Sequence, residues 1–241
     1  IVTAGGWLRS EQTLSLLLGN GLLDNSATND FSAGLISART LAVEAGTLTN
    51  IGSNQADQGL RASTLDLNIH GIDNTRGLIH ADHSLTLHGR EHINNTHGKI
   101  SSGEILRIAD TRPSRLRRSH QSAARRSAHK TQRITNTGGT LYAGRQFTLD
   151  SASLSNDGQL TSLGDMNIAI HGDYTNSGNI RANGALTFST DGTFTNQALF
   201  NALTNLTVSA GNVDNQLLGE LSAGSNLYLN IANLLTNRGL I

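Results

Sequence analysis

Apolar and polar residues alternate along this chain in short runs, and the runs repeat about every 20 residues. Residues 139–156 hold three such runs, whose apolar residues are Leu141, Ala143, Phe147, Leu149 and Leu154. Alternation with a period of two is typical of half-buried strands, whereas a helix would need apolar residues three and four apart over ten or more positions. Gly or Asn separates the runs, so each unit predicts three short strands.

A tripeptide marks the repeat: an apolar residue, then Asp, Thr, Ser or Asn, then Asn. Its ten copies end at Asn25, Asn50, Asn74, Asn95, Asn136, Asn156, Asn176, Asn196, Asn215 and Asn237. The successive spacings are 25, 24, 21, 41, 20, 20, 20, 19 and 22 residues. Units this short cannot bury their own apolar face, and they become stable by stacking on their neighbours.

Three strands per unit close a triangular coil, and stacked coils pair their strands in parallel. The sequence therefore predicts an all-β fold, a parallel β-helix (solenoid) of about ten coils that runs as a single segment through residues 1–241. At roughly 4.8 Å per coil, the rod is on the order of 50 Å long. We expect Leu and Ile columns inside it. We also expect each corner Asn to adopt a left-handed backbone and to stack its amide on the Asn of the next coil.

The repeat sequences resemble those of a known family. The segments LDNS, LTNIG, IDNTRGLIHA, ITNTGGTLYAGRQFTL and YTNSGNIRANGALTF resemble the haemagglutinin repeats of filamentous-haemagglutinin-type adhesins and of contact-dependent growth inhibition effectors. The resemblance covers nearly all of the chain. It implies a right-handed β-helix shaft, secretion across a Gram-negative outer membrane by a partner transporter, and adhesion or presentation of a toxin to a neighbouring cell.

This resemblance implies a location outside the cell, at the bacterial surface, and a receptor or glycan on a host or neighbouring cell as the target. The chain opens on Ile1 rather than Met and shows neither a secretion domain nor a toxin domain. We therefore expect an internal fragment of a longer protein, with flanking coils of the same chain covering its ends. The absence of Cys permits secretion, since no thiol is exposed to oxidation.

One stretch departs from the repeat. The whole chain balances 18 basic against 18 acidic residues, but residues 111–132 carry seven basic residues and no acid. The seven are Arg112, Arg115, Arg117, Arg118, Arg125, Arg126 and Lys130. The remaining 11 basic residues face 18 acids, a net charge of minus seven. The stretch is a solvated loop, a patch that binds sulfated glycan, anionic lipid or nucleic acid, or a coil that has lost its pattern.

Aligning residues 98–110 and 133–136 with the next unit makes these two segments one coil, with Ile108 and Ile134 in the same turn. The basic stretch is then a surplus within that coil. It has no interleaved aromatic residue, so we expect no nucleic acid as its ligand.

Candidate chemistry is sparse elsewhere. Six of the nine His residues fall close together in the sequence: His70, His80, His83, His88, His92 and His97. Their positions on strands and on different corners predict that they do not converge on one metal ion. Asp24, Asp73 and Asp214 recur beside the marker Asn, which indicates turn chemistry rather than catalysis. We expect no cofactor and no metal.

Three functions remain open at this point. The first is a non-enzymatic structural shaft, whose function is to span the distance between the cell and its target. The second is a glycan- or polyanion-binding module that uses the basic stretch 111–132. The third is a β-helical carbohydrate-active enzyme, which would need acids gathered on adjacent coils beside a groove. The scattered acids favour the first.

Overall fold

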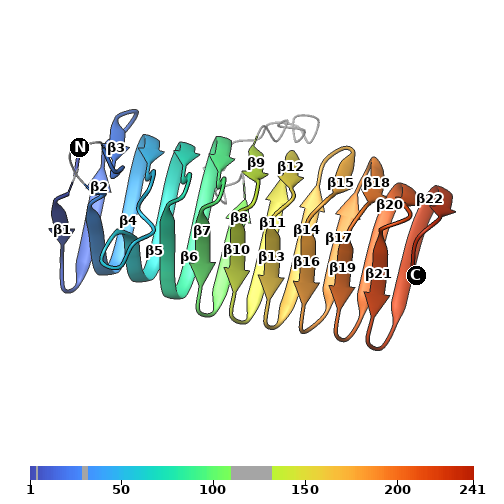
Figure 1. The fold of residues 1–241 in the computed structure, drawn as a ribbon. Coiled ribbons are helices and arrows are strands. Elements are labelled where there is room, and N and C mark those ends of the chain that lie inside the picture. The colour runs from blue at the N-terminus through green and yellow to red at the C-terminus, as the bar shows by residue number, and fades with distance from the viewer. Residues whose placement is uncertain (4, 29–31, 110–131) are drawn as a thin grey trace, which may run out of the picture.

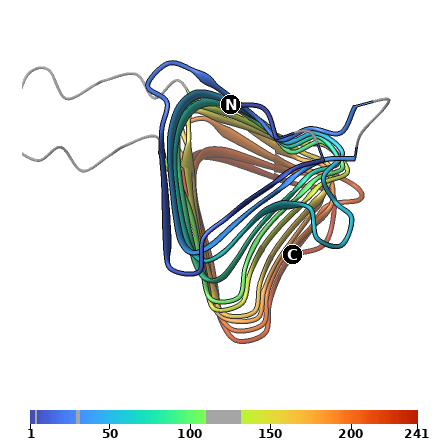
Figure 2. The same cartoon turned by 90° about the vertical axis from the view of Figure 1, so that its left-hand side faces the viewer.

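The computed structural model describes residues 1–3, 5–28, 32–109 and 132–241. These residues form strands joined by turns, and they contain no helix. Within this part of the chain, accordingly, no helix has the length and apolar character needed to cross a membrane. The strands wind into a rod with the chain ends at its two tips (Figure 1), and the rod has a triangular cross-section (Figure 2).

Each coil runs through three faces, here called the first, second and third face in chain order. In five coils the three strands are separate: β1 (Trp7–Arg9), β2 (Thr13–Leu17), β3 (Leu22–Asp24); β7 (Lys99–Ser102), β8 (Ile105–Ala109), β9 (Arg133–Asn136); β10 (Thr140–Ala143), β11 (Gln146–Ser151), β12 (Ser153–Asn156); β13 (Gln159–Ser162), β14 (Asp165–Ile170), β15 (Tyr174–Asn176); β16 (Asn179–Ala182), β17 (Leu186–Thr190), β18 (Thr193–Asn196).

In the other coils the strands continue through corners. Three long strands each span a whole coil: β4 (Leu35–Thr49), β5 (Gly59–Asp73) and β6 (Leu78–Asn94). The last two coils are formed by β19 (Leu199–Ala202) with β20 (Leu206–Asn215) and by β21 (Glu220–Ala223) with β22 (Leu227–Asn237).

Every coil pairs in parallel with the coil before it. On the first face, nine consecutive parallel pairings lead from β1 to β21. The backbone N–H and C=O groups of one coil are therefore satisfied by its neighbours along the rod. The predicted parallel β-helix of about ten coils is confirmed.

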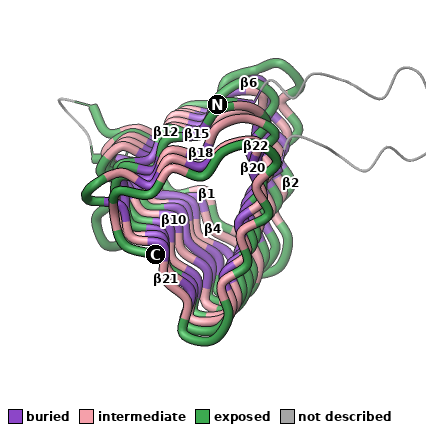
Figure 3. Tube along the Cα trace, turned by 90° about the vertical axis from the view of Figure 1, so that its right-hand side faces the viewer, coloured by how far each residue is buried: buried purple, intermediate pink, exposed green. Residues whose placement is uncertain are grey.

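The interior is a stack of apolar columns. Leu141 pairs with Leu160, Phe147 with Met166 and Leu149 with Ile168, as the repeat alignment predicts, and all six are buried. Further along, Tyr174, Phe188, Phe194 and Phe200 fill the interior with aromatic rings whose centroids lie 4.6 to 5.9 Å apart. Figure 3 shows that buried positions recur from coil to coil along the faces of the rod, with exposed positions mainly at the corners.

The coil that carries the basic stretch is complete in its described part. Ile108 of β8 pairs with Leu87 before it and Leu149 after it, and Ile134 of β9 pairs with Ile93 and Leu154. Strands β7, β8 and β9 thus form one turn of the rod. Gln132 belongs to this turn, because it is buried and its carbonyl accepts hydrogen bonds from the Ser151 hydroxyl and the Ala152 amide.

Deleting residues 111–131 and joining the ends with a short Gly-Ser bridge should barely change stability. The paired strands on both sides keep their partners, and closing a shorter loop changes the closure entropy by about 1 kcal/mol or less. Urea denaturation followed by circular dichroism measures this. A matched deletion of residues 111–134 should cost more, because it removes Ile134 from the buried column between Ile93 and Leu154. Unfolding of the rod by the first deletion would show that the segment is an integral part of the stack.

One expectation about the corners is wrong. No marker Asn in the described residues has a positive φ. The left-handed residue lies two positions later in four coils, at Gly52, Arg76, His97 and Gly138, with φ between 51° and 69°. The marker Asn instead keeps a backbone that directs its side chain inward, and the turn itself is made by the residues that follow.

Both ends of the rod expose apolar side chains. At the N-terminal tip Val2, Trp7 and Leu17 are 69 to 75% exposed. At the C-terminal tip Leu234 and Leu240 are 61% and 60% exposed, and β22 pairs with β20 on one side. The inner columns also end open: Leu14, which pairs with the buried Leu41, is only half-buried at the N-terminal tip, and Leu235, which pairs with the buried Val213, is 42% exposed at the C-terminal tip.

Candidate functional site

The marker Asn side chains form a ladder along the inside of one corner. In eight of the nine steps, the Nδ2 of one Asn donates to the Oδ1 of the next at 2.8 to 2.9 Å. Nine of the ten residues are at most 3% exposed. Several also donate to a backbone carbonyl of the turn, as Asn95 does to Gly98 at 3.2 Å. The ladder ties each corner to the next and satisfies amides that lie away from water.

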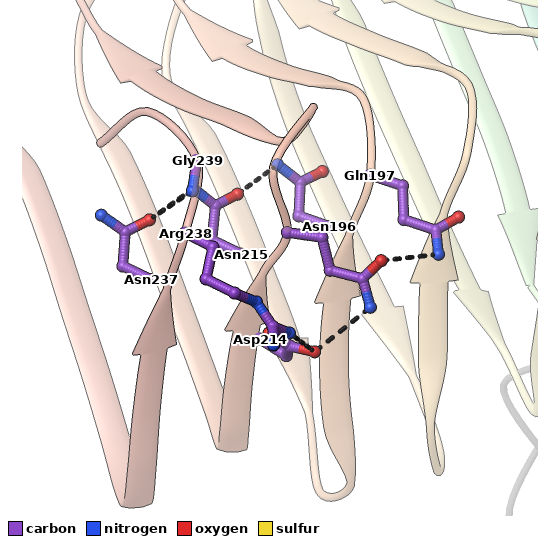
Figure 4. A network of polar contacts seen from close by, with 8 residues as sticks. Asn196, Gln197, Asp214, Asn215, Asn237, Arg238 and Gly239 are labelled. Atoms are coloured by element: carbon purple, nitrogen blue, oxygen red, sulfur yellow. Dashed lines mark hydrogen bonds and ion pairs between the residues drawn. The ribbon is translucent and has the colours of Figure 1, made fainter.

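The ladder ends at the C-terminal tip, as Figure 4 shows. Asn237 accepts from Asn215 at 2.8 Å and also from the Gly239 amide at 3.2 Å, and it is exposed. Outside the corner, Arg238 Nη2 donates to both carboxylate oxygens of Asp214 at 2.7 and 2.9 Å. These outer contacts are solvent-exposed, so they contribute little to stability.

One step of the ladder is missing, between Asn156 and Asn176. The Tyr174 hydroxyl donates to the Asn176 Oδ1 at 3.3 Å and lies beside the buried Asn156 amide, whose Nδ2 makes no hydrogen bond of good geometry. Burial raises the pKa of the Tyr174 phenol well above its usual range, so the hydroxyl remains a donor. The Tyr174 hydroxyl therefore binds the Asn176 Oδ1, the acceptor that would receive the Asn156 amide if this step matched the other eight.

The Tyr174→Phe variant should be as stable as the wild-type rod or more stable by about 1 kcal/mol, because the Asn156–Asn176 hydrogen bond can then form. Phe194 supports this expectation, since it pairs with Tyr174 in the next coil beside an intact Asn176–Asn196 step at 2.9 Å. Urea denaturation measures the effect, with the outer-face variant Tyr142→Phe as the control. A loss of more than about 1 kcal/mol in Tyr174→Phe would mean that the hydroxyl stabilises both amides.

The acids beside the marker Asn do not form a catalytic pair. Asp24, Asp73 and Asp214 lie in one outer column of the third face, but other residues separate them: Thr49 pairs between Asp24 and Asp73. Burial alone would raise the pKa of Asp24, but hydrogen bonds from the Thr49 hydroxyl (2.7 Å) and the Ser26 amide (3.0 Å) outweigh it and lower that pKa. An Asp held ionised in this way closes a turn and is poorly suited to act as a general acid.

The histidines likewise spread over separate surfaces. His80 lies 2.9 Å from the Ser101 hydroxyl and 3.4 Å from Asp82, His83 lies 3.4 Å from Glu104, and His70 lies 3.2 Å from Arg90. Across the ranges the structure describes, no three His, Cys, Asp or Glu residues are placed to hold a metal ion.

The seven basic residues of the predicted polyanion site fall outside the described residues. They are Arg112, Arg115, Arg117, Arg118, Arg125, Arg126 and Lys130, and the chain enters their segment from β8 and leaves it into β9. Their part in binding stays a prediction.

The charges of the described strands are unequal on the three faces. Paired strand positions of the first face carry Arg9, Arg61, Lys99 and Arg181 against Glu220. Those of the second carry Glu44, Asp66, Asp150 and Asp165 against Arg107. Those of the third carry Asp24, Asp73 and Asp214 against Arg133. Two faces are thus acidic and one is basic, a division that the counts along the sequence do not reveal.

The basic face also holds a groove that the sequence interpretation missed. It has a volume of about 570 Å³ and lies at the corner of the first four coils, where Arg9, Arg39 and Arg61 line it. These residues are 22 to 52 positions apart, so only the coil register brings them together. Their common outward position in successive repeats is the signal that could have found them.

Comparison with known families agrees with this architecture. The family model described as Haemagglutinin repeat matches residues 62–112, 119–170, 149–198 and 167–241. No curated protein and no solved structure shows significant similarity to the chain.

Proposed function

Because this chain belongs to the haemagglutinin repeat family, we propose that it is a length of the shaft of a secreted, cell-surface adhesin or toxin-delivery protein. The observation that carries the proposal is the parallel pairing of every coil with the next from β1 to β22, which continues through local register shifts between β5 and β6 and between β20 and β22. The length of such a rod grows with the number of coils, because every coil adds roughly 4.8 Å. A longer rod holds the parts at its end farther from the cell surface.

The chemistry of the surface favours a structural part over an enzyme. In the described residues the acids of the third face are separated by Thr and Asn. The two acids that line the groove, Glu11 and Asp82, belong to the first and fourth coils, about 14 Å apart along the rod. Hydrolysis of a glycosidic bond needs two carboxyl groups across one substrate. We infer that this length of chain supports other domains of the longer protein and catalyses no reaction itself.

Secretion by an outer-membrane partner transporter of Gram-negative bacteria is part of the proposal. A parallel β-helix suits this route, because each new coil can fold on the one before it as the chain emerges. The apolar tips fit the same picture: Leu235 continues the inner column of Val213 and is 42% exposed, and a flanking coil of the longer chain would cover it. The partner at the far end is a receptor or glycan on a host or neighbouring cell.

Removal of whole coils tests the shaft function. Deleting residues 137–196 joins Asn136 to Gln197 and removes three complete coils, so the ladder and the three faces should stay in register. We expect an unchanged circular dichroism spectrum and a rod shorter by about 14 Å in small-angle scattering. In the full-length protein on living cells, contact with target cells should decrease gradually with shortening.

A deletion of residues 137–186 is the matched control, because it removes two and a half coils and destroys the register. This variant should misfold. Complete loss of cell contact in the three-coil deletion, with the remaining domains folded and exported, would show that the removed coils bind the target and do more than extend the protein.

A further inference from the structure

The groove on the first face is built from three arginines around a floor of small residues. Arg9 of β1 pairs with Ser37 of β4, and Ser37 pairs with Arg61 of β5, so the two arginines stand in one outward column with a serine between them. Two coil spacings, about 10 Å, separate them. Ser37 and Ala38 leave the space between the arginines open, and Arg39 lines the groove at the corner.

The guanidinium groups of the groove have N–H donors that no protein group of the described residues uses. Within the described ranges no hydrogen bond or ion pair engages the side chain of Arg9 or Arg39, and both residues are exposed. Arg61 is half-buried, and its Nε donates to the Gln58 carbonyl at 3.0 Å. That bond fixes the stem of Arg61 and leaves its two terminal nitrogens for a ligand. Guanidinium groups bind carboxylates through two parallel hydrogen bonds.

Two acids at the edge limit the charge of the ligand. Glu11, in the turn between β1 and β2, and Asp82, in the corner of β6, also line the groove. His80, which pairs with Arg61, also lines the groove. With His80 counted as neutral, three arginines against two acids give a net charge of plus one, which suits a singly charged group better than a densely sulfated chain.

Asp82 already accepts from the Ser63 hydroxyl at 3.4 Å and lies 3.4 Å from His80, and the Ser10 hydroxyl donates to the Thr13 carbonyl at 3.0 Å. The Glu11 carboxylate and the remaining lone pairs of the two serine hydroxyls can accept hydrogen bonds from hydroxyl groups on the ligand.

An apolar platform lies beside the groove. Trp7 is two residues before Arg9 on β1, and it is 71% exposed. Alternation along the strand places both side chains on the same outer face. An exposed indole next to hydrogen-bonding groups can receive the apolar face of a sugar ring.

From these observations we propose that the groove formed by Arg9, Arg39 and Arg61 binds a carboxylate-bearing sugar of an oligosaccharide. The arginines hold the carboxylate, Glu11 and the serines hold the ring hydroxyls, and Trp7 contacts an adjacent ring. The site is separate from the basic stretch 111–132, and it gives the shaft a lateral contact with anionic glycans along its first four coils.

Calorimetric titration of the 241-residue chain tests the proposal, with sialyllactose and a trigalacturonate as the carboxylate-bearing probes. Binding of the first alone assigns a terminal sialate, and binding of the second alone assigns a uronate chain. Lactose, which lacks the carboxylate, should bind at least tenfold more weakly. A carrageenan-derived hexasaccharide carries sulfates and no carboxylate, and its binding should depend on these arginines less than binding of the carboxylated probes does.

The variants locate the site. Arg9→Ala and Arg61→Ala should each weaken binding of the carboxylated probe about tenfold, and the triple variant with Arg39→Ala should abolish it. Arg181→Ala, an exposed arginine on the same face but four coils beyond the groove's last coil, should leave binding within twofold. Unchanged thermal denaturation of all variants confirms the fold. Binding of neither carboxylated probe, equal binding of lactose, or full binding by the triple variant would overturn the proposal.

Discussion

Leu149→Asp is expected to lower the free energy of unfolding by several kcal/mol. Leu149 is 1% exposed and lies in an apolar column between Ile108 and Ile168. Truncation to Ala at such a site costs about 2–5 kcal/mol, and a carboxylate without a partner costs more because it also loses its hydration. Urea denaturation monitored by circular dichroism measures the loss. Hydrogen exchange should show it concentrated in β8, β11 and β14, because coils of a solenoid depend mainly on their neighbours.

Thr148→Asp is the matched control for this change. Thr148 is adjacent on β11 but lies in an outer column between Arg107 and Asn167. A carboxylate there stays hydrated, so stability should change by no more than about 0.5 kcal/mol. Equal losses in the two variants would contradict the assignment of inner and outer columns.

Asn95→Asp should cost about 3 kcal/mol or more at neutral pH. Asn95 is fully buried, accepts from Asn74 at 2.8 Å and donates to Asn136 at 2.8 Å. A carboxylate keeps the first bond but sets a negative oxygen against the Asn136 Oδ1 and is buried with its charge. Protonation at acidic pH removes the charge and restores a donor, so the loss should shrink as the pH falls through the carboxyl range.

Asn237→Asp makes the same substitution at the exposed end of the ladder. There the side chain only accepts, from Asn215 and from the Gly239 amide, so a carboxylate serves as well as an amide. We expect a change within about 0.5 kcal/mol. Denaturation of both variants at pH 4 and pH 7 separates the two positions. A loss at Asn237 as large as that at Asn95 would mean that the ladder does not depend on alternating donors and acceptors.

The sequence by itself determined the fold class, because a β-helix repeats one local pattern. The alternation in residues 139–156 specifies three half-buried strands, and its recurrence every 20 residues forces each coil onto the next. Even the coil split by the basic stretch could be assigned, since Ile108 and Ile134 keep the columns of Leu149 and Leu154. The marker Asn was visible for the same reason.

Only the tertiary structure decided what depends on contacts between coils. It placed the left-handed turn residue two positions after the Asn, at Arg76 and His97, because the Asn side chain is needed inside. Tyr174 fits the apolar column as Phe194 does, so the sequence gives no sign that its hydroxyl interrupts the ladder. The arginine groove also depends on contacts between coils. The coils differ in length, and only their stacking places Arg9, Ser37 and Arg61, which are far apart in the chain, in one column.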